Sequence, residues 1–365
     1  AGGGTKMAKV LMKGTEAIAE AAIQAGCRYF YGYPITPQSE ILEWMSWRQK
    51  EVGGTFVQGE SEIASVNMTF AARALGVRAL TSTSGPGFSL YQEGIAYWVS
   101  AGVPAVAACV QRFGIGDGFI SAGQDNYWQA VKGGGNGDYH LIVLAPNSVQ
   151  ENVDMAYESF ALAEKWSHPV LILSDGTIGQ MMEPCELPPF VEYDIDQEQP
   201  WAVKGVQPGK DYKVITDITY FKDLDEWNDD YLARMREISE TEQRWESFEV
   251  KNADVVLVAY GISSRVAQGA VEQAHEEGFK LGLIRPITLW PYPRKAFETI
   301  PDTCRGVVTV EVNMMGQMRD DVIITVKGKF PTFALATRQR IPKVDQVIEF
   351  AKAVYNGEVK EVEVF

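Results

Sequence analysis

Two hydrophobic periodicities alternate along the first half of the chain. Apolar residues recur every three or four positions in segments such as 14–26, 61–76 and 149–166, which predicts amphipathic helices. The segments between them are strand-like, and the run at 103–114 is almost continuously apolar, as expected of a parallel strand buried on both faces. This alternation predicts an open parallel sheet with helices on both sides.

The pattern changes after residue 183. The next stretch is acidic and rich in proline, which is typical of a linker, and residues 223–250 have a charged pattern that predicts a solvent-exposed helix. A second alternation of strand and helix patterns starts near residue 253. We therefore expect an α/β fold with two doubly wound parallel-sheet domains: a first domain over 7–183, a linker with a charged helix over 184–250, and a second domain over 251–365.

Charge and composition argue against several classes of function. The chain has 365 residues, with 33 Lys and Arg against 48 Asp and Glu, and a net charge of −15. Nucleic acid is an improbable partner for such a chain, because phosphate binding needs clustered cations. No apolar run approaches the roughly 20 residues of a membrane-spanning helix. The four cysteines and three histidines are scattered, so we expect no metal site in this chain and a reducing, cytoplasmic location.

Polar, glycine and proline residues follow four predicted strands of the first domain. These segments are GYPITP (32–37), GESE (59–62), STSGPG (82–87) and QRFGIGDG (111–118). In doubly wound sheets, ligands bind beyond the carboxyl ends of the strands. Four such segments on one edge predict a binding site there.

The first of these segments places Thr36 between Pro34 and Pro37. Proline fixes its own φ and pushes the preceding residue into extended geometry, so Tyr33 and Thr36 are expected on a rigid, extended hook. One interpretation is a β-to-α turn in which Thr36 caps the next helix. The other is a hook that presents Thr36 to a ligand.

Glu62 lies at a predicted strand-to-helix junction. A carboxylate there can stabilise the positive end of the helix dipole and do nothing else. Alternatively, it points from the first turn into the cleft, where a buried carboxyl group can hold a proton and share it with a ring nitrogen. The residues alone leave both interpretations open.

A glycine-rich segment opens the helix after the third strand of this group. Ser84, Gly85 and Gly87 surround Pro86, and backbone amides at the start of a helix can receive an anion. The lysine of a P-loop is missing, so this segment is not a nucleotide-binding P-loop.

Arg112 ends the most apolar strand of the chain. An arginine is unfavourable there unless it is paired, and its planar fork suits a carboxylate, which makes it a candidate for binding an anionic substrate. Alternatively, it forms an internal ion pair with Glu62 or Asp117.

One further segment mimics a metal–diphosphate signature. Residues 116–118 (GDG) precede Asn147 at a spacing close to the GDG…NN motif, but Ser148 replaces the second asparagine. A glycine-rich stretch at 119–139 also replaces the helix that should follow. We expect no metal–diphosphate site here and interpret the stretch as a flexible loop on the substrate side.

The chain resembles a known protein family over these motifs. The α subunits of 2-oxoacid:ferredoxin (acceptor) oxidoreductases are similar to residues 14–37 (GTEAIAEAAIQAGCRYFYGYPITP), 60–95 (ESEIASVNMTFAARALGVRALTSTSGPGFSLYQEGI) and 133–151 (GGGNGDYHLIVLAPNSVQE). The resemblance is strong over 14–183 and looser through the second unit. The GGGNGDY stretch is closest to the branched-chain (2-oxoisovalerate) branch.

The resemblance implies a thiamine diphosphate enzyme whose site is split between chains. The first domain would be the pyrimidine-binding domain and the second a transketolase C-terminal-like domain. A β subunit would hold the diphosphate, Mg²⁺ and an iron–sulfur cluster, with a γ subunit and a ferredoxin-like δ subunit as further partners. The reaction would be oxidative decarboxylation of a 2-oxoacid to CO2 and acyl-coenzyme A, with electrons passing to ferredoxin or, through a flavin subunit, to NAD.

The resemblance also assigns roles by position. Glu62 matches the glutamate that hydrogen-bonds N1′ of the aminopyrimidine, Thr36 the threonine that binds the substrate carboxylate or oxo group, and Arg112 the arginine that neutralises this carboxylate. The other residues expected at the cofactor are Pro34, Ser84, Gly85 and Gly87. The expected substrate pocket consists of Tyr33, Ile35, Thr36, Arg112, Phe113 and Phe119.

Phe113 and Phe119 stand where the family usually has smaller residues. Aromatic walls favour a branched-chain or aromatic 2-oxoacid, with 2-oxoglutarate or phenylglyoxylate oxidoreductase as alternatives. The alternative of another class is a non-catalytic scaffold subunit. The degraded diphosphate motif argues against a self-contained transketolase-like enzyme, and the absence of GxGxxG after the first strand argues against an NAD-binding Rossmann domain.

Overall fold

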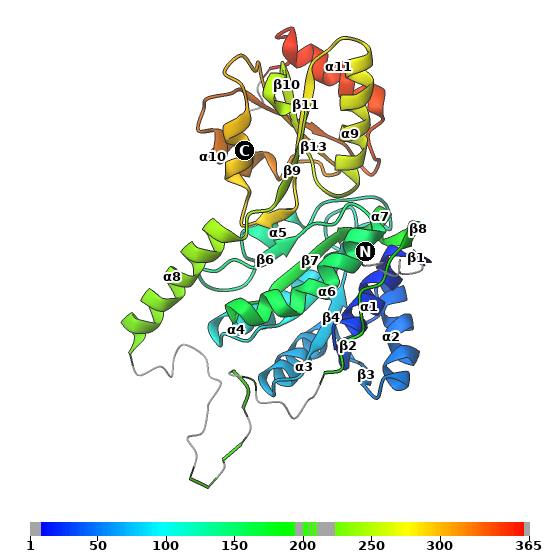
Figure 1. The fold of residues 1–365 in the computed structure, drawn as a ribbon, viewed down its shortest axis with the longest axis vertical. Helices are drawn as coiled ribbons and strands as arrows, with labels where there is room; N and C mark the ends of the chain where they lie inside the picture. Colours follow the sequence, from blue (N-terminus) through cyan, green and yellow to red (C-terminus); the bar gives the residue numbers. More distant parts are fainter. Residues whose placement is uncertain are drawn as a thin grey trace, which may run out of the picture.

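Two α/β units stacked along the long axis of the molecule make up the computed structural model (Figure 1). The structure describes residues 9–193, 199, 201–203, 205–206, 208–209 and 223–360. The N-terminal unit forms the lower part of Figure 1 and the C-terminal unit the upper part. The predicted α/β class is confirmed.

The first unit follows the predicted alternation of strands and helices. Its elements are β1 (Val10–Lys13), α1 (Gly14–Gln24), β2 (Tyr29–Gly32), α2 (Ser39–Glu51), β3 (Thr55–Gln58), α3 (Glu62–Ala74), β4 (Ala79–Thr83), α4 (Gly85–Ser100), β5 (Val106–Gln111), α5 (Tyr127–Val131), β6 (Ile142–Leu144), α6 (Val149–Trp166), β7 (Val170–Asp175), α7 (Gly176–Gln180) and β8 (Met182–Cys185). The main sheet has seven strands in the order β12-β6-β7-β5-β4-β2-β3. All neighbours are parallel except β12, which comes from the second half of the chain and pairs antiparallel with β6.

Strand β5 shows why this sheet needs helices on both faces. All its residues are buried, as the continuous apolar run predicts. Ala107 and Cys109 pack into a core that includes residues of α3 and α4, whereas Val106 and Ala108 pack into a second core with α1, α2 and α6. Successive side chains of a strand point to opposite faces, so a strand with a core on each side has no polar positions.

The connections of the main sheet diverge between β2 and β4. From β2 the chain continues to its neighbour β3 on one side, and from β4 it continues to β5 on the other side. Such a reversal of strand order is the topological switch point of a doubly wound sheet and leaves a crevice beyond the carboxyl ends of the two strands.

A two-stranded antiparallel ribbon of β1 and β8 lies outside the main sheet. Val10 pairs with Cys185 and Lys13 with Met182. The ribbon crosses residue 183, where the first domain was expected to end. The divisions 7–183, 184–250 and 251–365 remain a proposal, because both chain ends and part of the linker lie outside the described residues.

The second unit is built on a smaller sheet. The chain from residue 223 onward contains α8 (Leu224–Thr241), β9 (Trp245–Phe248), η2 (Val250–Asn252), β10 (Val255–Val258), α9 (Gly261–Glu276), β11 (Leu281–Pro286), β12 (Thr288–Trp290), η3 (Arg294–Thr299), β13 (Val307–Glu311), α10 (Arg319–Val326), β14 (Thr332–Ala336) and α11 (Val344–Tyr355). Of these, α8 and β12 pack on the first unit. The five strands follow the order β14-β13-β10-β11-β9, with β9 antiparallel at the edge and the others parallel. The switch point of this sheet lies between β10 and β13.

The prediction of one charged helix over 223–250 is wrong in its last part. Helix α8 ends at Thr241, and residues 245–248 form the edge strand β9. Strand β9 pairs with β11, and its Glu246 forms an ion pair with Arg285 at 2.9 Å, so tertiary pairing overrides the local helical pattern. The predicted exposure holds for most of α8, whose buried residues are Tyr231 and Ile238.

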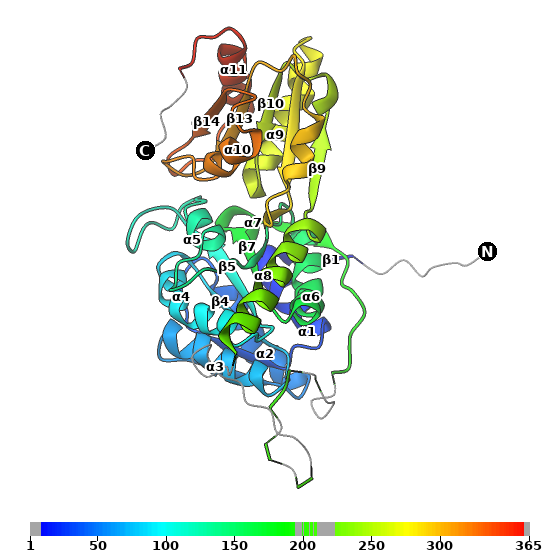
Figure 2. The same cartoon turned by 90° about the vertical axis from the view of Figure 1, so that its left-hand side faces the viewer.

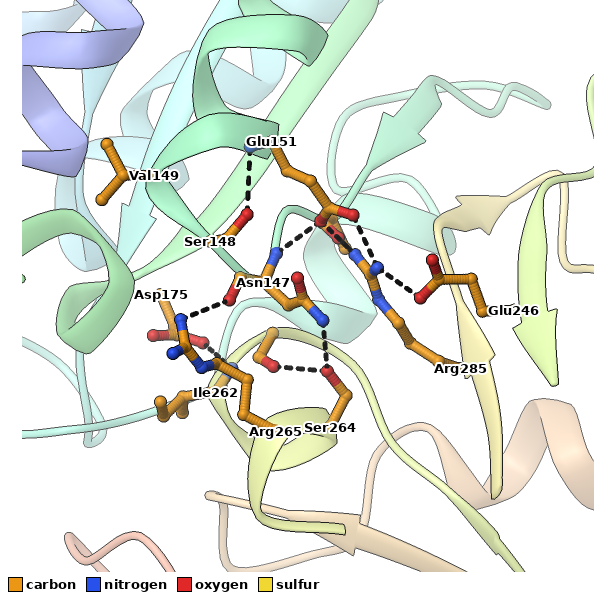
Figure 3. Close-up of polar contacts among 12 residues, drawn as sticks. Asn147, Ser148, Val149, Glu151, Asp175, Glu246, Ile262, Ser264, Arg265 and Arg285 are labelled. Carbon is orange, nitrogen blue, oxygen red and sulfur yellow. Dashed lines mark hydrogen bonds and ion pairs between the residues drawn. The ribbon is translucent and has the colours of Figure 1, made fainter. Parts of the chain in front are cut away.

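Arg285 of β11 joins the two units (Figure 3). Its side chain is buried, and its Nη1 donates to Glu151 of α6 at 2.6 Å and to Glu246 at 2.9 Å, while its Nη2 donates to the carbonyl of Ala145 at 3.2 Å. Removing the acceptors of a buried guanidinium is strongly destabilising, because the charge is then left uncompensated. The residue therefore fixes β11 against the start of α6.

The start of α9 is held by the first unit in the same region (Figure 3). The amide of Ile262 donates to Asp175 at 2.7 Å, and Asn147 donates to the hydroxyl of Ser264 at 3.2 Å. Burial raises the pKa of Asp175 to about 6, although the amides of Ile178 and Ile262 act in the opposite direction. The α9 N-terminus and a carboxylate of the first unit thus satisfy each other.

Candidate functional site

The four polar strand ends of the first unit lie side by side. Strands β5, β4, β2 and β3 are consecutive neighbours and run parallel, so their carboxyl ends share one edge of the sheet. The crevice of the switch point lies in the middle of this edge, between β2 and β4. The topology therefore brings together the segments that the sequence singled out.

The segment after β2 (33–38) forms a hook at this edge. Thr36 is exposed, and its peptide bond to Pro37 is cis. Helix α2 begins at Ser39 with Gln38 as its N-cap. The interpretation of Thr36 as the cap of this helix is therefore wrong, and its exposure agrees with the alternative of a hook that presents Thr36.

Two glutamines hold the hook in place. Gln38 is fully buried; its Nε2 donates to the carbonyl of Tyr33 at 3.0 Å, and its Oε1 accepts from the hydroxyl of Ser82 in β4 at 2.6 Å. Gln180 of α7 donates to the carbonyl of Pro37 at 2.8 Å. Neither glutamine is predicted from the sequence, because a single glutamine carries no signal of its tertiary partner.

Arg112 connects the hook to the loop after β5. Its Nη1 donates to the carbonyl of Thr36 at 2.8 Å, and its Nη2 lies 2.9 Å from Oδ1 of Asp117 and also contacts the Asp117 carbonyl. Of the two ion pairs considered from the sequence, the one with Asp117 is present and the one with Glu62 is not. The Asp117 side chain is 95% exposed, so water competes for this pair.

The side of the Arg112 guanidinium that carries Nε has an unused hydrogen-bond donor. Nε is buried, and no residue of the described chain accepts a hydrogen bond from it. Gly85 lies against the same side chain, since a Cβ at this glycine would be 3.2 Å from Cγ of Arg112. Arg112 thus has a spare donor beside the start of α4.

Glu62 is a buried carboxylate without a protein partner. It is the first residue of α3, its side chain is 6% exposed, and it accepts no hydrogen bond from the described residues. It faces the start of α4: a Cβ at Gly87 would lie 2.5 Å from Oε1 of Glu62 and 2.2 Å from the hydroxyl oxygen of Thr83. Only glycine leaves room for this carboxylate, which agrees with the interpretation that Glu62 points into the cleft.

The start of α4 offers further unsatisfied polar groups. Ser84 is the N-cap, yet its hydroxyl makes no cap bond and has no hydrogen-bond partner among the described residues, although it is fully buried. Gly85, Pro86 and Gly87 form the first turn, where backbone amides lack helical partners. The Ser84 hydroxyl and the Arg112 Nε are buried polar atoms without a partner in the described chain, and the Glu62 carboxylate lies at the same helix start. This set of groups suits a polar ligand.

The two predicted aromatic walls differ in exposure. Phe113 is 5% exposed, whereas Phe119 is 64% exposed. Their backbones pair as an isolated antiparallel bridge, in which the amide of Phe119 donates to the carbonyl of Phe113 at 2.7 Å. Of the hook residues proposed for the pocket or cofactor, Tyr33 and Ile35 are half-buried and Pro34 is exposed.

The interpretation of residues 119–139 as one flexible loop is wrong, because part of this stretch is helical. It contains helix α5, whose Tyr127 is fully buried and donates to Asp321 of α10 at 2.8 Å. Figure 2 shows α5 directly below α10. Just before α5, burial raises the pKa of Asp125 to about 6, and its Oδ2 has no partner within the described chain.

The remaining features do not add to this site. Asn147, part of the diphosphate-like spacing, is engaged at the domain interface instead (Figure 3). A groove of about 1000 Å³ lies between α4, the glycine-rich segment 134–139 and α8, and none of the candidate site residues lines it. Its charged residues are Glu93 and Asp138, so it does not suit an anionic ligand.

The described part of the chain holds neither a metal-binding cluster nor a membrane-spanning helix. They contain no group of three or more His, Cys, Asp or Glu side chains arranged to hold a metal ion. None of the helices within the described ranges has both the length and the apolar character to cross a bilayer.

Family models and known proteins are similar to this chain over most of its length. The family model "pyruvate flavodoxin/ferredoxin oxidoreductase, thiamine diP-binding" matches residues 20–251, and "pyruvate:ferredoxin oxidoreductase core domain II" matches residues 253–347. The ketoisovalerate oxidoreductase subunit VorB of Methanothermobacter marburgensis is 45% identical over 317 residues, which cover 87% of this chain and 89% of VorB. The 2-oxoglutarate synthase subunit KorA of Methanocaldococcus jannaschii is 34% identical over 346 residues, with coverage of 87% and 94%.

Solved structures share the fold. A 2-oxoglutarate:ferredoxin oxidoreductase from Magnetococcus marinus matches with a TM-score of 0.82 at 24% identity, over 96% of this chain and 66% of that one. A split-gene transketolase matches with a TM-score of 0.59 at 13% identity, over 94% and 98% of the two chains. The predicted pairing of a thiamine-diphosphate-binding fold with a transketolase-like arrangement is confirmed.

Proposed function

Because the chain belongs to the pyruvate flavodoxin/ferredoxin oxidoreductase family and is a subunit of a 2-oxoacid:ferredoxin oxidoreductase, we propose that its first domain forms the pyrimidine side of a thiamine diphosphate site. The substrate that we propose is a branched-chain 2-oxoacid, which would be converted to CO2 and acyl-coenzyme A. The single observation that carries this proposal is the buried Glu62 carboxylate, which lacks a protein partner.

The residues around Glu62 fit the cofactor. No described residue donates a hydrogen bond to the Glu62 carboxylate, so a ligand that donates to it would fit at this position. A ring nitrogen of the aminopyrimidine is such a donor, and Glu62 would hold or release the proton on its carboxyl oxygen. Gly87 leaves the necessary space, and Ser84 offers a free hydroxyl. Thiamine diphosphate, when bound, supplies the electron sink that decarboxylation of a 2-oxoacid requires.

Arg112 and Thr36 would bind the substrate carboxylate. The Nη1 bond to the Thr36 carbonyl keeps the guanidinium in place, while Nε and Nη2 form a fork for a carboxylate. Nη2 is paired with the exposed Asp117, which the substrate would displace. The Thr36 hydroxyl lies on the same hook and would donate to the carboxylate or the oxo group.

The charges of the site favour a substrate with one carboxylate. Arg112 is the only Lys or Arg in the four strand-end segments 32–37, 59–62, 82–87 and 111–118. A second carboxylate, as in 2-oxoglutarate, would need a second cation. Ile35 and Phe113 offer apolar surface for a branched side chain, and the likeness to VorB supports the same substrate class.

The remaining parts of the enzyme belong to partner chains in this proposal. The relatives are named as subunits, and the four cysteines here are buried and distant in sequence, so this chain would not hold an iron–sulfur cluster. A β subunit would hold the diphosphate, Mg²⁺ and a cluster, with γ and ferredoxin-like δ subunits completing a cytoplasmic complex. Coenzyme A would accept the acyl group, and electrons would pass to ferredoxin or, through a flavin subunit, to NAD.

Viologen reduction by the native complex tests the substrate. The panel should include 2-oxoisovalerate, pyruvate, 2-oxoglutarate and phenylglyoxylate, each with and without coenzyme A. We expect the highest kcat/KM with 2-oxoisovalerate and a requirement for coenzyme A. A preference for 2-oxoglutarate would overturn the one-carboxylate proposal, and no turnover with any 2-oxoacid would favour a scaffold role.

A further inference from the structure

The loop that carries Asp117 and Phe119 returns to β5 before it contacts the second unit. The amide of Phe113 donates to the carbonyl of Ser121 at 3.3 Å. Gly123 then packs on the start of the loop, since a Cβ there would lie 2.3 Å from the Phe113 nitrogen and 2.6 Å from the Arg112 carbonyl carbon. The position of Gly123 therefore determines where Arg112 and Phe113 lie.

The next residue, Gln124, is fully buried and bonds almost entirely to the second unit. Its backbone amide donates to the carbonyl of Val312 at 2.7 Å, and its Oε1 accepts from the Val312 amide at 3.1 Å and from the Ser263 hydroxyl at 3.0 Å. Its Nε2 donates to the carbonyl of Tyr260 at 3.0 Å, and its carbonyl lies 3.4 Å from Nδ2 of Asn313.

These partners occupy one particular place in the second sheet. Tyr260 follows β10, and Val312 and Asn313 follow β13, so Gln124 lies at the carboxyl ends of the two strands that form the switch point. This is where a doubly wound sheet ordinarily binds its ligand. Here, the side chain of Gln124 from the first unit takes that place.

A second contact secures the same loop. Gln111, the last residue of β5, accepts from the amide of Asn126 at 3.3 Å, and its Oε1 lies 3.5 Å from the Tyr260 hydroxyl. The start and the end of the loop are therefore tied together beneath the second unit. Arg112 lies between these two fixed points.

We infer that Gln124 is a positioning residue through which the second domain sets the place of Arg112 and its loop for substrate binding. The inference rests on the proposed function for Arg112, but the anchoring itself does not. When its side-chain bonds are removed, the loop keeps the backbone bonds of Gln124 to the residues after β13 but loses those to Tyr260, Ser263 and the Val312 amide. Gly123 is then held less firmly against Arg112.

The test uses the assembled complex with Gln124→Leu, which keeps the size of the side chain and removes its hydrogen bonds. Hydrogen–deuterium exchange of the Phe113 and Phe119 amides should accelerate at least about fivefold, because local opening becomes easier. The KM for the 2-oxoacid should rise about tenfold, as expected for the loss of hydrogen bonds, while kcat at saturation stays within about threefold.

Two serines of α9 provide the companion variants. Ser263→Ala removes one donor to Gln124 and should raise the exchange rate of the loop and the KM by a smaller factor. If the Gln124→Leu complex does not assemble, this variant tests the anchoring instead. Ser264→Ala is the matched control, because its partner is Asn147 rather than the loop, and it should change neither exchange nor KM.

The outcomes separate the inference from the proposed function. Unchanged exchange of the loop in the Gln124 or Ser263 variants would overturn the anchoring, as would equal acceleration in Ser264→Ala. Faster exchange with an unchanged KM would uphold the anchoring and overturn the role of Arg112 in substrate binding.

Discussion

Arg112, at the end of the most apolar strand, donates a hydrogen bond from Nη1 to the backbone carbonyl of Thr36, 2.8 Å away in the hook after β2. Its Nη2 forms an ion pair with Asp117 in the loop after β5. One guanidinium thus joins three of the site's parts: the hook, the central strand and the loop. Its loss should affect all of them.

Arg112→Ala should raise the KM for the 2-oxoacid about 10- to 100-fold, because charge-assisted hydrogen bonds contribute about 1.5–3 kcal/mol. Asp117→Ala should instead leave KM unchanged or lower it, since it removes a competitor for the guanidinium. Steady-state kinetics of the reconstituted complexes measure both. Equal KM values for the wild type and the Arg112 variant would contradict this role.

Glu62→Gln should reduce kcat by about 10²- to 10⁴-fold, the range expected when a general acid–base group is lost. Folding should be preserved, because the neutral amide removes a buried charge without a protein partner. Glu60→Gln is the control, two residues away and exposed, and should retain full activity. If the Glu62 variant turns over within twofold of the wild type, the carboxylate does not act in the reaction.

Gly87→Ala should abolish most activity and lower the free energy of unfolding by about 1–3 kcal/mol, because the new methyl group overlaps Glu62 and Thr83. Gly269→Ala is the matched control in α9, where a Cβ would meet only Val344 Cγ2 at 3.5 Å. There, the alanine should stabilise the helix by about 0.5–1 kcal/mol. Thermal denaturation and activity of both variants test this difference, and a fully active Gly87 variant would show that Glu62 has room to move.

Asp175 should make stability depend on pH. Burial raises its pKa to about 6 in the folded chain, above the usual aspartate value, so the folded state binds this proton more tightly than the unfolded state. Its contribution to stability therefore grows as the pH falls from about 7 towards 4 and is lost as the pH rises through about 6. The variant Asp175→Asn lacks this titration.

The measurement is the free energy of unfolding of wild type minus that of Asp175→Asn, determined by denaturant titration at several pH values. This difference should shift in favour of the wild type between pH 7 and pH 5. A difference that stays constant, or shifts the other way, would show that Asp175 is ionised throughout.

Local patterns in the sequence were enough for the parallel strands of the main sheet and for the edge on which the site forms. The apolar run of β5 predicts a strand with a core on each face, because its burial leaves no polar positions. Strand β9 was missed because Trp245–Phe248 continues a helical pattern, and only pairing with β11 makes it a strand.

The contacts within the site depend on tertiary structure. The sequence offered both Glu62 and Asp117 as partners of Arg112, and only the path of the loop after β5 selects Asp117. Gln38 and Gln124 carry no local signal for these roles, since Gln38 bonds to Ser82, 44 residues away, and Gln124 to Tyr260, 136 residues away. The roles of Glu62, Thr36 and Arg112 in the reaction remain predictions, which the variants above test.

The way α9 begins also limits where an electron-accepting dinucleotide can bind. A helix N-terminus at a switch point is the usual seat of a pyrophosphate. In this chain, Asp175 accepts the Ile262 amide there, and Gln124 lies beside Gly261, where a Cβ would be 3.0 Å from its Nε2. The first domain thus places a carboxylate and an amide of its own in the phosphate position of the second domain. If NAD is the final acceptor, it does not bind at the α9 N-terminus, and electrons must leave this chain's active site without a nucleotide there.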